Sequence, residues 1–258
     1  MKILRYSADG ATNYGTLEED GTIHPLAGTP FDALDASAPD THLDQVRTLA
    51  PLASPRIIGV GLNYAAHARE GGHEAPSFPM LFMKPSTAVI GPEDPIVYPR
   101  QAQNLQHECE LAVVMGQTTP RHVSAAQALD YVLGYTCGND ISERVIQRAE
   151  MDMGCLLIGK GFDTFCPLGP YIATGLDPTN LDISTRVNGV EKQNSNTSDL
   201  LFPVARLISY ISEALTLLPG DVILTGTPSG VSSVVPGDLI EIEVAGIGIL
   251  RNPVVAEA

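Results

Sequence analysis

Two glutamates, Glu108 and Glu110, stand two positions apart at the start of an apolar run. If that run is a strand, both carboxylates point to the same face, because side chains alternate across a strand. Asp140 follows a second apolar run and could bring a third carboxylate to the same place. Each pair of carboxylates in contact would cost about 4 kcal/mol at an effective dielectric near 20, so the cluster requires a cation or shifted pKa values.

The donor set determines which cation such a cluster would hold. Carboxylate oxygens favour a hard ion, so we expect Mg²⁺ or Mn²⁺, with Ca²⁺ as a further option. Zinc is disfavoured because no His or Cys has suitable spacing. Two structural alternatives stay open. Glutamates two apart also occur at solvated strand ends, and Asp140 with Glu143 three residues later also resembles a helix capping box.

His67 and Glu70 are three residues apart, which makes them neighbours on one face of a helix. A carboxylate beside an imidazole orients the ring and raises its basicity, as a general base requires. The same spacing is also typical of an exposed helix surface. Gly71 and Gly72 follow immediately, so this helix could move as a lid over a site.

Composition and charge exclude several classes of partner. The 258 residues include 15 Lys or Arg and 30 Asp or Glu, which gives a formal charge of −15. This charge argues against nucleic acid and anionic membranes as partners, and no apolar run is long enough for a membrane span or signal peptide. An anionic substrate would need a local positive centre, for which Lys160 and Arg144 are candidates. The four cysteines lack CxxC spacing, which predicts reduced thiols and a cytoplasmic location.

The 24 glycines and 20 prolines interrupt short aliphatic runs throughout the chain. This pattern is typical of a predominantly β protein with a few helices. We expect a small N-terminal unit and linker over residues 1–54 and a main domain over residues 55–258. Strands are predicted at Lys2–Tyr6, Tyr14–Leu17, Thr22–His24, Arg56–Val60, Cys109–Met115, Val132–Cys137, Val222–Thr225 and Leu239–Val244.

Four segments have helical patterns. They are a weak one at Leu43–Leu49, a short one at Asn63–Glu70, a polar one at Ser142–Met151 and an amphipathic one at Ala205–Leu215. Asn63 is the predicted N-cap of the second segment, and Asp140 is predicted to start the third.

The segment Gly154–Lys160 has the glycine and lysine spacing of a phosphate-binding P-loop. The next residue is Gly161 rather than Ser or Thr, the loop residues are apolar, and Pro167 would interrupt a following helix. We therefore reject phosphate binding by this segment.

Taken together, several segments resemble the fumarylacetoacetate hydrolase family in content and order. The matching segments extend from Arg56 to the C-terminus and lie at residues 61–70, 81–87, 107–114, 134–142, 160–164, 187–190, 218–228 and 246–252. The resemblance implies that family's mixed β-sandwich roll, carrying here a small N-terminal α/β unit. It also implies a homodimer.

The resemblance assigns roles to ten residues. The implied metal ligands, with Mg²⁺ most usual, are Glu108, Glu110 and Asp140. The implied catalytic residues, a dyad on a mobile helix and a lysine beside the metal, are His67, Glu70 and Lys160. The implied substrate contacts are Arg144, Gln147 and Thr227, and the residue implied to lie in the surrounding shell is Thr164.

The sequence departs from the family's pattern in a few places. Gly138 replaces a common Ala, Gly161 replaces a common Ser, residues 151–158 lack a common Trp, and the loop after Thr227 is short. We expect these differences to affect the substrate pocket rather than the metal site.

The leading hypothesis is a divalent-metal-dependent hydrolase that cleaves a C–C bond in an acylpyruvate-type 2,4-dioxo acid. The metal would chelate a small anionic 2-oxo acid, and His67 would deprotonate the attacking water. The resulting enolate would be held at the metal and by Lys160. The alternatives are a 2-hydroxyhepta-2,4-diene-1,7-dioate isomerase, an oxaloacetate-type decarboxylase and a non-catalytic metal-binding protein.

Overall fold

The computed structural model describes residues 1–32, 35, 38–72 and 74–258. Strands dominate this part of the chain, as the short aliphatic runs predicted. The α-helices are α1 (Ala65–Glu70), α2 (Arg144–Asp152), α3 (Ile158–Gly161) and α4 (Val204–Ser212). The 3₁₀ turns are Leu43–Gln45, Ser86–Ala88, Ala128–Tyr131 and Thr197–Asp199. In the described ranges, none of the helices has the length and apolar character needed to cross a membrane.

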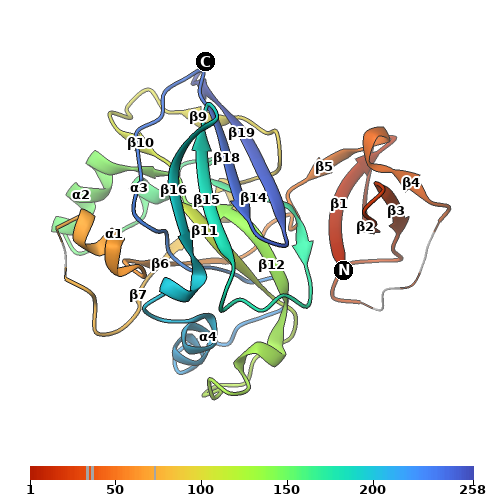
Figure 1. The fold of residues 1–258 in the computed structure, drawn as a ribbon, viewed down its shortest axis with the longest axis horizontal. Coiled ribbons are helices and arrows are strands. Elements are labelled where there is room, and N and C mark those ends of the chain that lie inside the picture. The colour runs from red at the N-terminus through yellow and green to blue at the C-terminus, as the bar shows by residue number, and fades with distance from the viewer. Residues whose placement is uncertain (33–34, 36–37, 73) are drawn as a thin grey trace.

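The larger sheet extends through the whole molecule (Figure 1). Its strands follow the order β4-β3-β2-β1-β14-β12-β11-β17-β6-β7, and β5 and β8 pair with β1 and β14. The strands are β1 (Lys2–Ala8), β2 (Ala11–Leu17), β3 (Thr22–Pro25), β4 (Thr41–His42), β5 (Arg47–Leu49), β6 (Ile57–Gly61), β7 (Met80–Lys84), β8 (Val89–Ile90), β11 (Cys109–Met115), β12 (Val132–Asn139), β14 (Cys166–Ala173) and β17 (Val222–Leu224). Because β11 and β12 each have a strand on both sides, their ends are firmly positioned.

A second sheet packs over the first and makes the molecule a two-layer sandwich. Its order is β16-β15-β18-β19-β9, and β18 and β19 pack against β12 and β14. Its strands are β9 (Ile96–Tyr98), β15 (Asp182–Val187), β16 (Val190–Asn196), β18 (Leu239–Val244) and β19 (Gly248–Ala256), and a separate pair is β10 (Leu105–Gln106) with β13 (Ser142–Glu143). The main apolar core lies between the layers and joins residues such as Val113 and Ile242. The mixed β-sandwich implied by the resemblance is confirmed.

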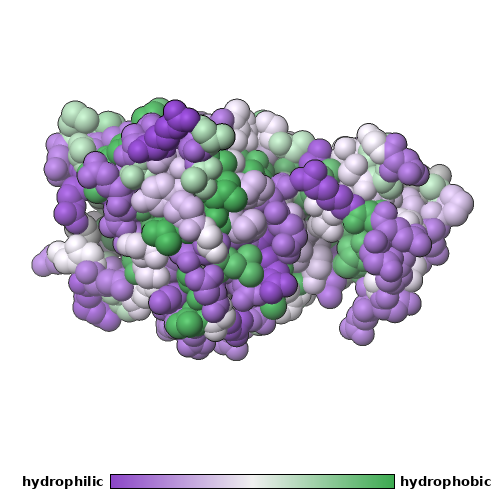
Figure 2. All heavy atoms as spheres, turned by 90° about the horizontal axis from the view of Figure 1, so that it is seen from above, coloured by the Kyte–Doolittle hydropathy of each residue, from purple (hydrophilic) through white to green (hydrophobic). Residues whose placement is uncertain are grey.

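The N-terminal strands form a smaller lobe at the side of the molecule away from α1 and α2 (Figure 1). Figure 2 shows the same two unequal lobes from above, with a mostly hydrophilic face on which hydrophobic residues form separate small patches. The lobe joins the main sheet through β1, in which Lys2 and Ile3 pair with Ala173 and Ile172 of β14.

The helix predicted at Leu43–Leu49 is wrong. This segment forms the 3₁₀ turn Leu43–Gln45 and then β5, which pairs with residues 5–7 of β1. Residues 5–7 of β1 are not paired with β14, so β5 can form backbone hydrogen bonds with them. A helix as short as the predicted one is marginally stable by itself. The described part of the N-terminal lobe therefore contains strands and no α-helix.

The predicted starts of two helices are also wrong. Tyr64, not Asn63, precedes α1, because the Asn63 side chain bonds instead to the backbone of Phe202 and Thr225. Glu143 precedes α2, and its carboxylate accepts a hydrogen bond from Ile146 N at 2.7 Å. The Asp140 carboxylate is thus not a helix cap and points elsewhere.

Candidate active site

Three carboxylates from two neighbouring strands meet at one end of the large sheet. Glu108 precedes β11, Glu110 lies in β11, and Asp140 follows β12. Because β11 and β12 are antiparallel, with Cys109 opposite Asn139, the start of one strand lies beside the end of the other. One oxygen from each carboxylate lies within 4.8 Å of the others, and all three residues are buried. The structure therefore brings the three predicted metal ligands together.

Three cationic side chains surround this triad. Lys160 Nζ lies 2.8 Å from Glu108 Oε2 and 2.5 Å from Asp140 Oδ2. Lys84 Nζ lies 2.5 Å from Asp140 Oδ1, and Arg144 Nη2 lies 2.6 Å from Glu108 Oε1. Both lysines are almost fully buried, a position that an ammonium group tolerates only when it is paired with an anion. Burial alone would lower the pKa of Lys160, but the charges of Asp140 and Glu108 raise it, so this side chain is cationic.

The two glutamates occupy different electrostatic environments. Burial raises the pKa of Glu108, but the charges of Lys160 and Arg144 outweigh burial and hold that pKa well below its usual range. Glu110 accepts a hydrogen bond from Gly226 N at 2.6 Å and forms no ion pair with any described residue. Burial and then the charges of Asp140 and Glu108 hold the pKa of Glu110 well above its usual range.

The difference in electrostatic environment between Glu108 and Glu110 indicates whether the site suits a metal. Glu110 is a buried carboxylate that forms no ion pair in the described chain, and the charge of Lys160 only partly offsets its burial. A divalent cation at the triad would supply the missing positive charge. The all-oxygen donor set matches a hard ion. The residues therefore fit a divalent metal held by Glu108, Glu110 and Asp140.

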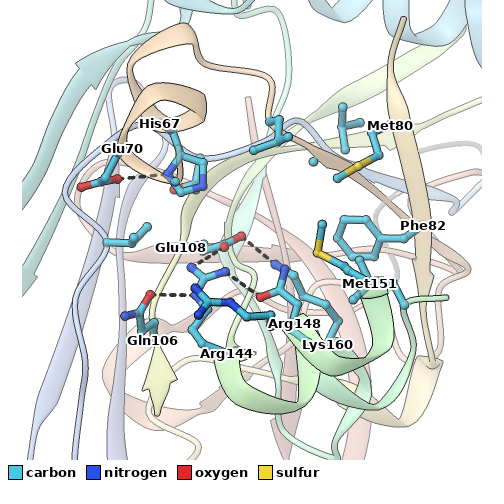
Figure 3. A pocket seen from close by; sticks show the side chains of 18 of the residues that line it. His67, Glu70, Met80, Phe82, Gln106, Glu108, Arg144, Arg148, Met151 and Lys160 are labelled. Atoms are coloured by element: carbon cyan, nitrogen blue, oxygen red, sulfur yellow. Dashed lines mark hydrogen bonds and ion pairs between the residues drawn. The ribbon is translucent and has the colours of Figure 1, made fainter. Parts of the chain in front are cut away.

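Helix α1 places the imidazole of His67 across from Glu108 of the triad (Figure 3). His67 Nδ1 lies 3.1 Å from Glu70 Oε2, and Gly230 N donates to Glu70 Oε1 at 3.0 Å. Glu70 is thus held between the helix and the loop that follows Thr227. With the proton on Nδ1, the Nε2 atom of His67 is left as an acceptor, as general-base chemistry requires.

A cavity of about 500 Å³ separates α1 from α2. The cavity is lined by charged and polar residues together with apolar residues. The polar lining residues include His67, Glu70, Gln106, Glu108, Arg144, Gln147, Arg148, Lys160 and Thr227. The apolar ones include Val60, Leu62, Met80, Phe82, Met151, Leu156 and Val231.

All three predicted substrate contacts line this cavity. Arg144 donates from Nε to Gln106 Oε1 at 2.7 Å and from Nη1 to Gln147 Oε1 at 2.8 Å. The Thr227 hydroxyl accepts from Gln193 Nε2 at 2.7 Å. Thr164 lies apart from the cavity, because its hydroxyl accepts from Val97 N at 2.9 Å.

The expectation that all departures from the family's pattern affect the pocket is wrong for two glycines. Gly138 packs against Leu224 in the core, and Gly161 packs against the ring of Pro85, so neither lines the cavity. The segment without Trp and the short loop after Thr227 do contribute residues to the lining of the cavity. Met151 and Leu156 from the segment without Trp, and Val231 from the short loop, are lining residues.

Lys84 is a site residue for which the sequence analysis assigned no role. It ends the apolar strand β7 and contacts Asp140 of the triad, but it is not among the residues that line the cavity. A signal was available, since a lysine at the end of an apolar run requires an anionic partner if that end is buried.

Comparisons with known proteins identify the family of this chain. The profile of the fumarylacetoacetate hydrolase C-terminal family matches residues 56–255, and that of the Rv2993c-like N-terminal family matches residues 1–51. A protein of Archaeoglobus fulgidus is 46% identical over 251 residues, which are 97% of this chain and 95% of that protein.

Two solved structures show what kinds of enzyme share the fold. The 5-carboxymethyl-2-hydroxymuconate delta-isomerase of Mycobacterium smegmatis has a TM-score of 0.92 and 44% identity over 100% of both chains. The fumarylpyruvate hydrolase of Pseudomonas aeruginosa, in complex with Mn²⁺ and pyruvate, has a TM-score of 0.76 and 36% identity over 82% of this chain and 92% of its own. With a matching profile over most of its length and these enzymes as structural neighbours, this chain belongs to the fumarylacetoacetate hydrolase family.

Proposed function

We propose that this protein cleaves a C–C bond in an acylpyruvate-type 2,4-dioxo acid with the help of Mg²⁺ or Mn²⁺. The observation that carries the proposal is that one cavity is lined both by the His67–Glu70 pair and by Glu108, a member of the acidic triad. The hydrolase neighbour was solved with Mn²⁺ and pyruvate, and pyruvate is the 2-oxo acid that acylpyruvate cleavage releases.

The charges of the acidic triad and of its three cationic partners suit an anionic substrate. The three carboxylates contribute −3 and the side chains of Lys84, Lys160 and Arg144 contribute +3. A divalent ion would leave this region at −3 + 3 + 2 = +2, although the whole chain carries −15. A bound ion supplies Lewis-acid polarisation of the keto-acid oxygens.

The chain's own residues account for the remaining steps. His67 Nε2 takes a proton from the water that attacks the distal carbonyl, and Glu70 stabilises the imidazolium that forms. As the C–C bond breaks, its electron pair passes to the 2-oxo acid fragment, and the cations of Lys160 and Arg144 stabilise that charge. Gln147 and Thr227 supply polar groups that orient the substrate.

The test is a panel of acylpyruvates, oxaloacetate and a 2-hydroxy-dienedioate. Each is incubated with Mg²⁺ or Mn²⁺ and, in parallel, with EDTA, and the products are identified by carbon-13 NMR. We expect pyruvate and a carboxylic acid in the metal-containing reactions alone. Cleavage that continues after metal removal contradicts the proposal. Release of CO₂ from oxaloacetate, without acylpyruvate cleavage, would identify the protein as a decarboxylase instead.

A second candidate is a 2-hydroxy-dienedioate isomerase. It is supported by the isomerase neighbour, which aligns over the full length of both chains. This reaction moves a proton within the substrate and needs no attacking water, so His67 would serve as the proton carrier. In the same panel, a rearranged dienoate with no loss of carbon would favour this candidate.

A further inference from the structure

Glu150, in the last turn of α2, has a carboxylate that is bound by three backbone amides. Leu157 N and Gly159 N donate to Glu150 Oε2 at 3.2 and 2.9 Å, and Ile158 N donates to Oε1 at 2.7 Å. Glu150 is 8% exposed. Three successive amides that converge on an anion form the kind of concave cradle that binds phosphates in other proteins.

This cradle is the segment whose glycine and lysine spacing resembles a P-loop. Its amides are occupied by a carboxylate of the same chain, so they are not available to a phosphate, in agreement with the missing hydroxyl residue that phosphate loops require. The side chains of Leu157 and Ile158 are exposed, because their amides point inward to Glu150.

The cradle ends at a residue of the active site. Lys160 follows Gly159 directly, and its ammonium group bonds to Glu108 and Asp140. The backbone of Gly159 lies against α2 so closely that a Cβ atom at this position would be 2.6 Å from Gln147 Cα. The hydrogen bonds of Glu150 therefore hold α3 against α2. Helix α3 carries Lys160, and α2 carries Arg144 and Gln147.

We propose that Glu150 is a positioning residue, an internal anion that holds the Gly154–Lys160 loop and thereby places the Lys160 ammonium on the acidic triad. The carboxylate is buried and paired with amides rather than with a cation, so its contribution is to fix the backbone that precedes Lys160. The expected effect of Glu150 variants on kcat rests on the function proposed above. The amide cradle and the placement of Lys160 on the triad do not depend on that function.

The cradle can be tested without turnover, in the full-length protein. Glu150→Gln keeps the size of the side chain and removes its charge. We expect the amide proton resonances of Ile158 and Gly159 to lie far downfield in the wild type and to move upfield in this variant. Glu213→Gln, an exposed change just after α4, is the matched control and should leave both resonances in place. Unchanged Ile158 and Gly159 resonances in E150Q would overturn the assignment.

The positioning role can be tested by Mn²⁺ titration of the metal-free protein. Because the Lys160 ammonium repels a cation at the triad, Lys160→Met is expected to bind Mn²⁺ several-fold more tightly than the wild type. If Glu150 acts by placing Lys160, E150Q should also tighten Mn²⁺ binding, but should add nothing in the K160M background. Equal tightening in both backgrounds, or none in the wild-type background, contradicts the proposal.

Chemical rescue supplies a kinetic test. Glu150→Ala empties the cradle, so kcat on an acylpyruvate should fall and should recover in part with added formate, but not with sodium chloride at equal ionic strength. E150Q should not be rescued, because its amide still fills the space. A folded E150A protein that formate does not restore counts against the role. A wild-type protein without turnover counts against the proposed function alone, since the amide spectra and the Mn²⁺ titration need no substrate.

Discussion

At the residue scale, the two glutamates of the triad differ although they stand two positions apart. Glu108 is paired with Lys160 and Arg144, whereas Glu110 accepts a single backbone hydrogen bond. The pKa of Glu110 is raised because it is buried and faces the charges of Asp140 and Glu108. Without a metal it is therefore the one of these two glutamates that retains its proton more readily.

Glu110→Gln is expected to abolish stabilisation by metal. Adding Mg²⁺ or Mn²⁺ at 100 times its Kd should stabilise the wild type by about 2.7 kcal/mol. The variant, which cannot provide a charged ligand, should unfold at the same temperature in metal and in EDTA. Because the metal must displace a proton from Glu110, wild-type affinity should weaken as the pH falls. Metal-dependent melting of E110Q equal to that of the wild type would exclude Glu110 as a ligand.

His67→Ala should separate the chemistries that remain open. Loss of the general base should lower kcat for acylpyruvate cleavage by about 10²–10⁴-fold, whereas decarboxylation of oxaloacetate requires no activated water and should be spared. Pyruvate release from both substrates is the measurement, and His24→Ala in the N-terminal lobe is the control. Unaltered acylpyruvate cleavage by H67A would rule out His67 as the base.

At the scale of elements, α1 has six residues, too few for a helix to be stable alone. Its first turn is tied down by Asn63, whose Nδ2 donates to Phe202 O and Thr225 O and whose Oδ1 accepts from Phe202 N. Its last turn is held by Glu70 on Gly230 N. The position of His67 therefore depends on contacts with distant segments.

Asn63→Ala should destabilise the protein by about 1–3 kcal/mol, because it leaves backbone groups of Phe202 and Thr225 without partners. Urea unfolding measures this cost. Asn194→Ala, which removes an exposed bond to Glu191, should change stability by less than about 0.5 kcal/mol. Equal effects of the two variants would mean that Asn63 does not anchor α1.

At the scale of the whole molecule, one group of exposed apolar side chains lies on the segment of α2 and α3, next to residues that line the cavity. Val145, Met153, Leu157 and Ile158 on and between α2 and α3 are all more than two-fifths exposed. The family resemblance implies a homodimer, and this segment is where we expect the second copy to pack.

Light scattering after size exclusion should give the mass of a dimer for the wild type. Met153→Glu places a charge on a side chain that is 74% exposed and should shift the protein toward the monomer. Val190→Glu, at an exposed valine of β16, should leave the dimer intact. A wild-type monomer, or a dimer that M153E does not weaken, would contradict this expectation.

Local patterns were enough to predict much of this protein. The spacing of Glu108 and Glu110 predicts two carboxylates on one face, and that of His67 and Glu70 predicts neighbours on a helix, because strand and helix periods are properties of the backbone itself. The short runs between Gly and Pro likewise predict a mostly β fold.

The roles of other residues and segments were decided by the tertiary structure, because each depends on a partner that is distant in the chain. Asp140 had the local signals of both a cap and a ligand, and it became part of the triad because β11 and β12 pair. Residues 47–49 became a strand because β1 offered an edge. Lys84 and Glu150 acquired their roles from an anion and a row of amides that only the folded chain brings within reach.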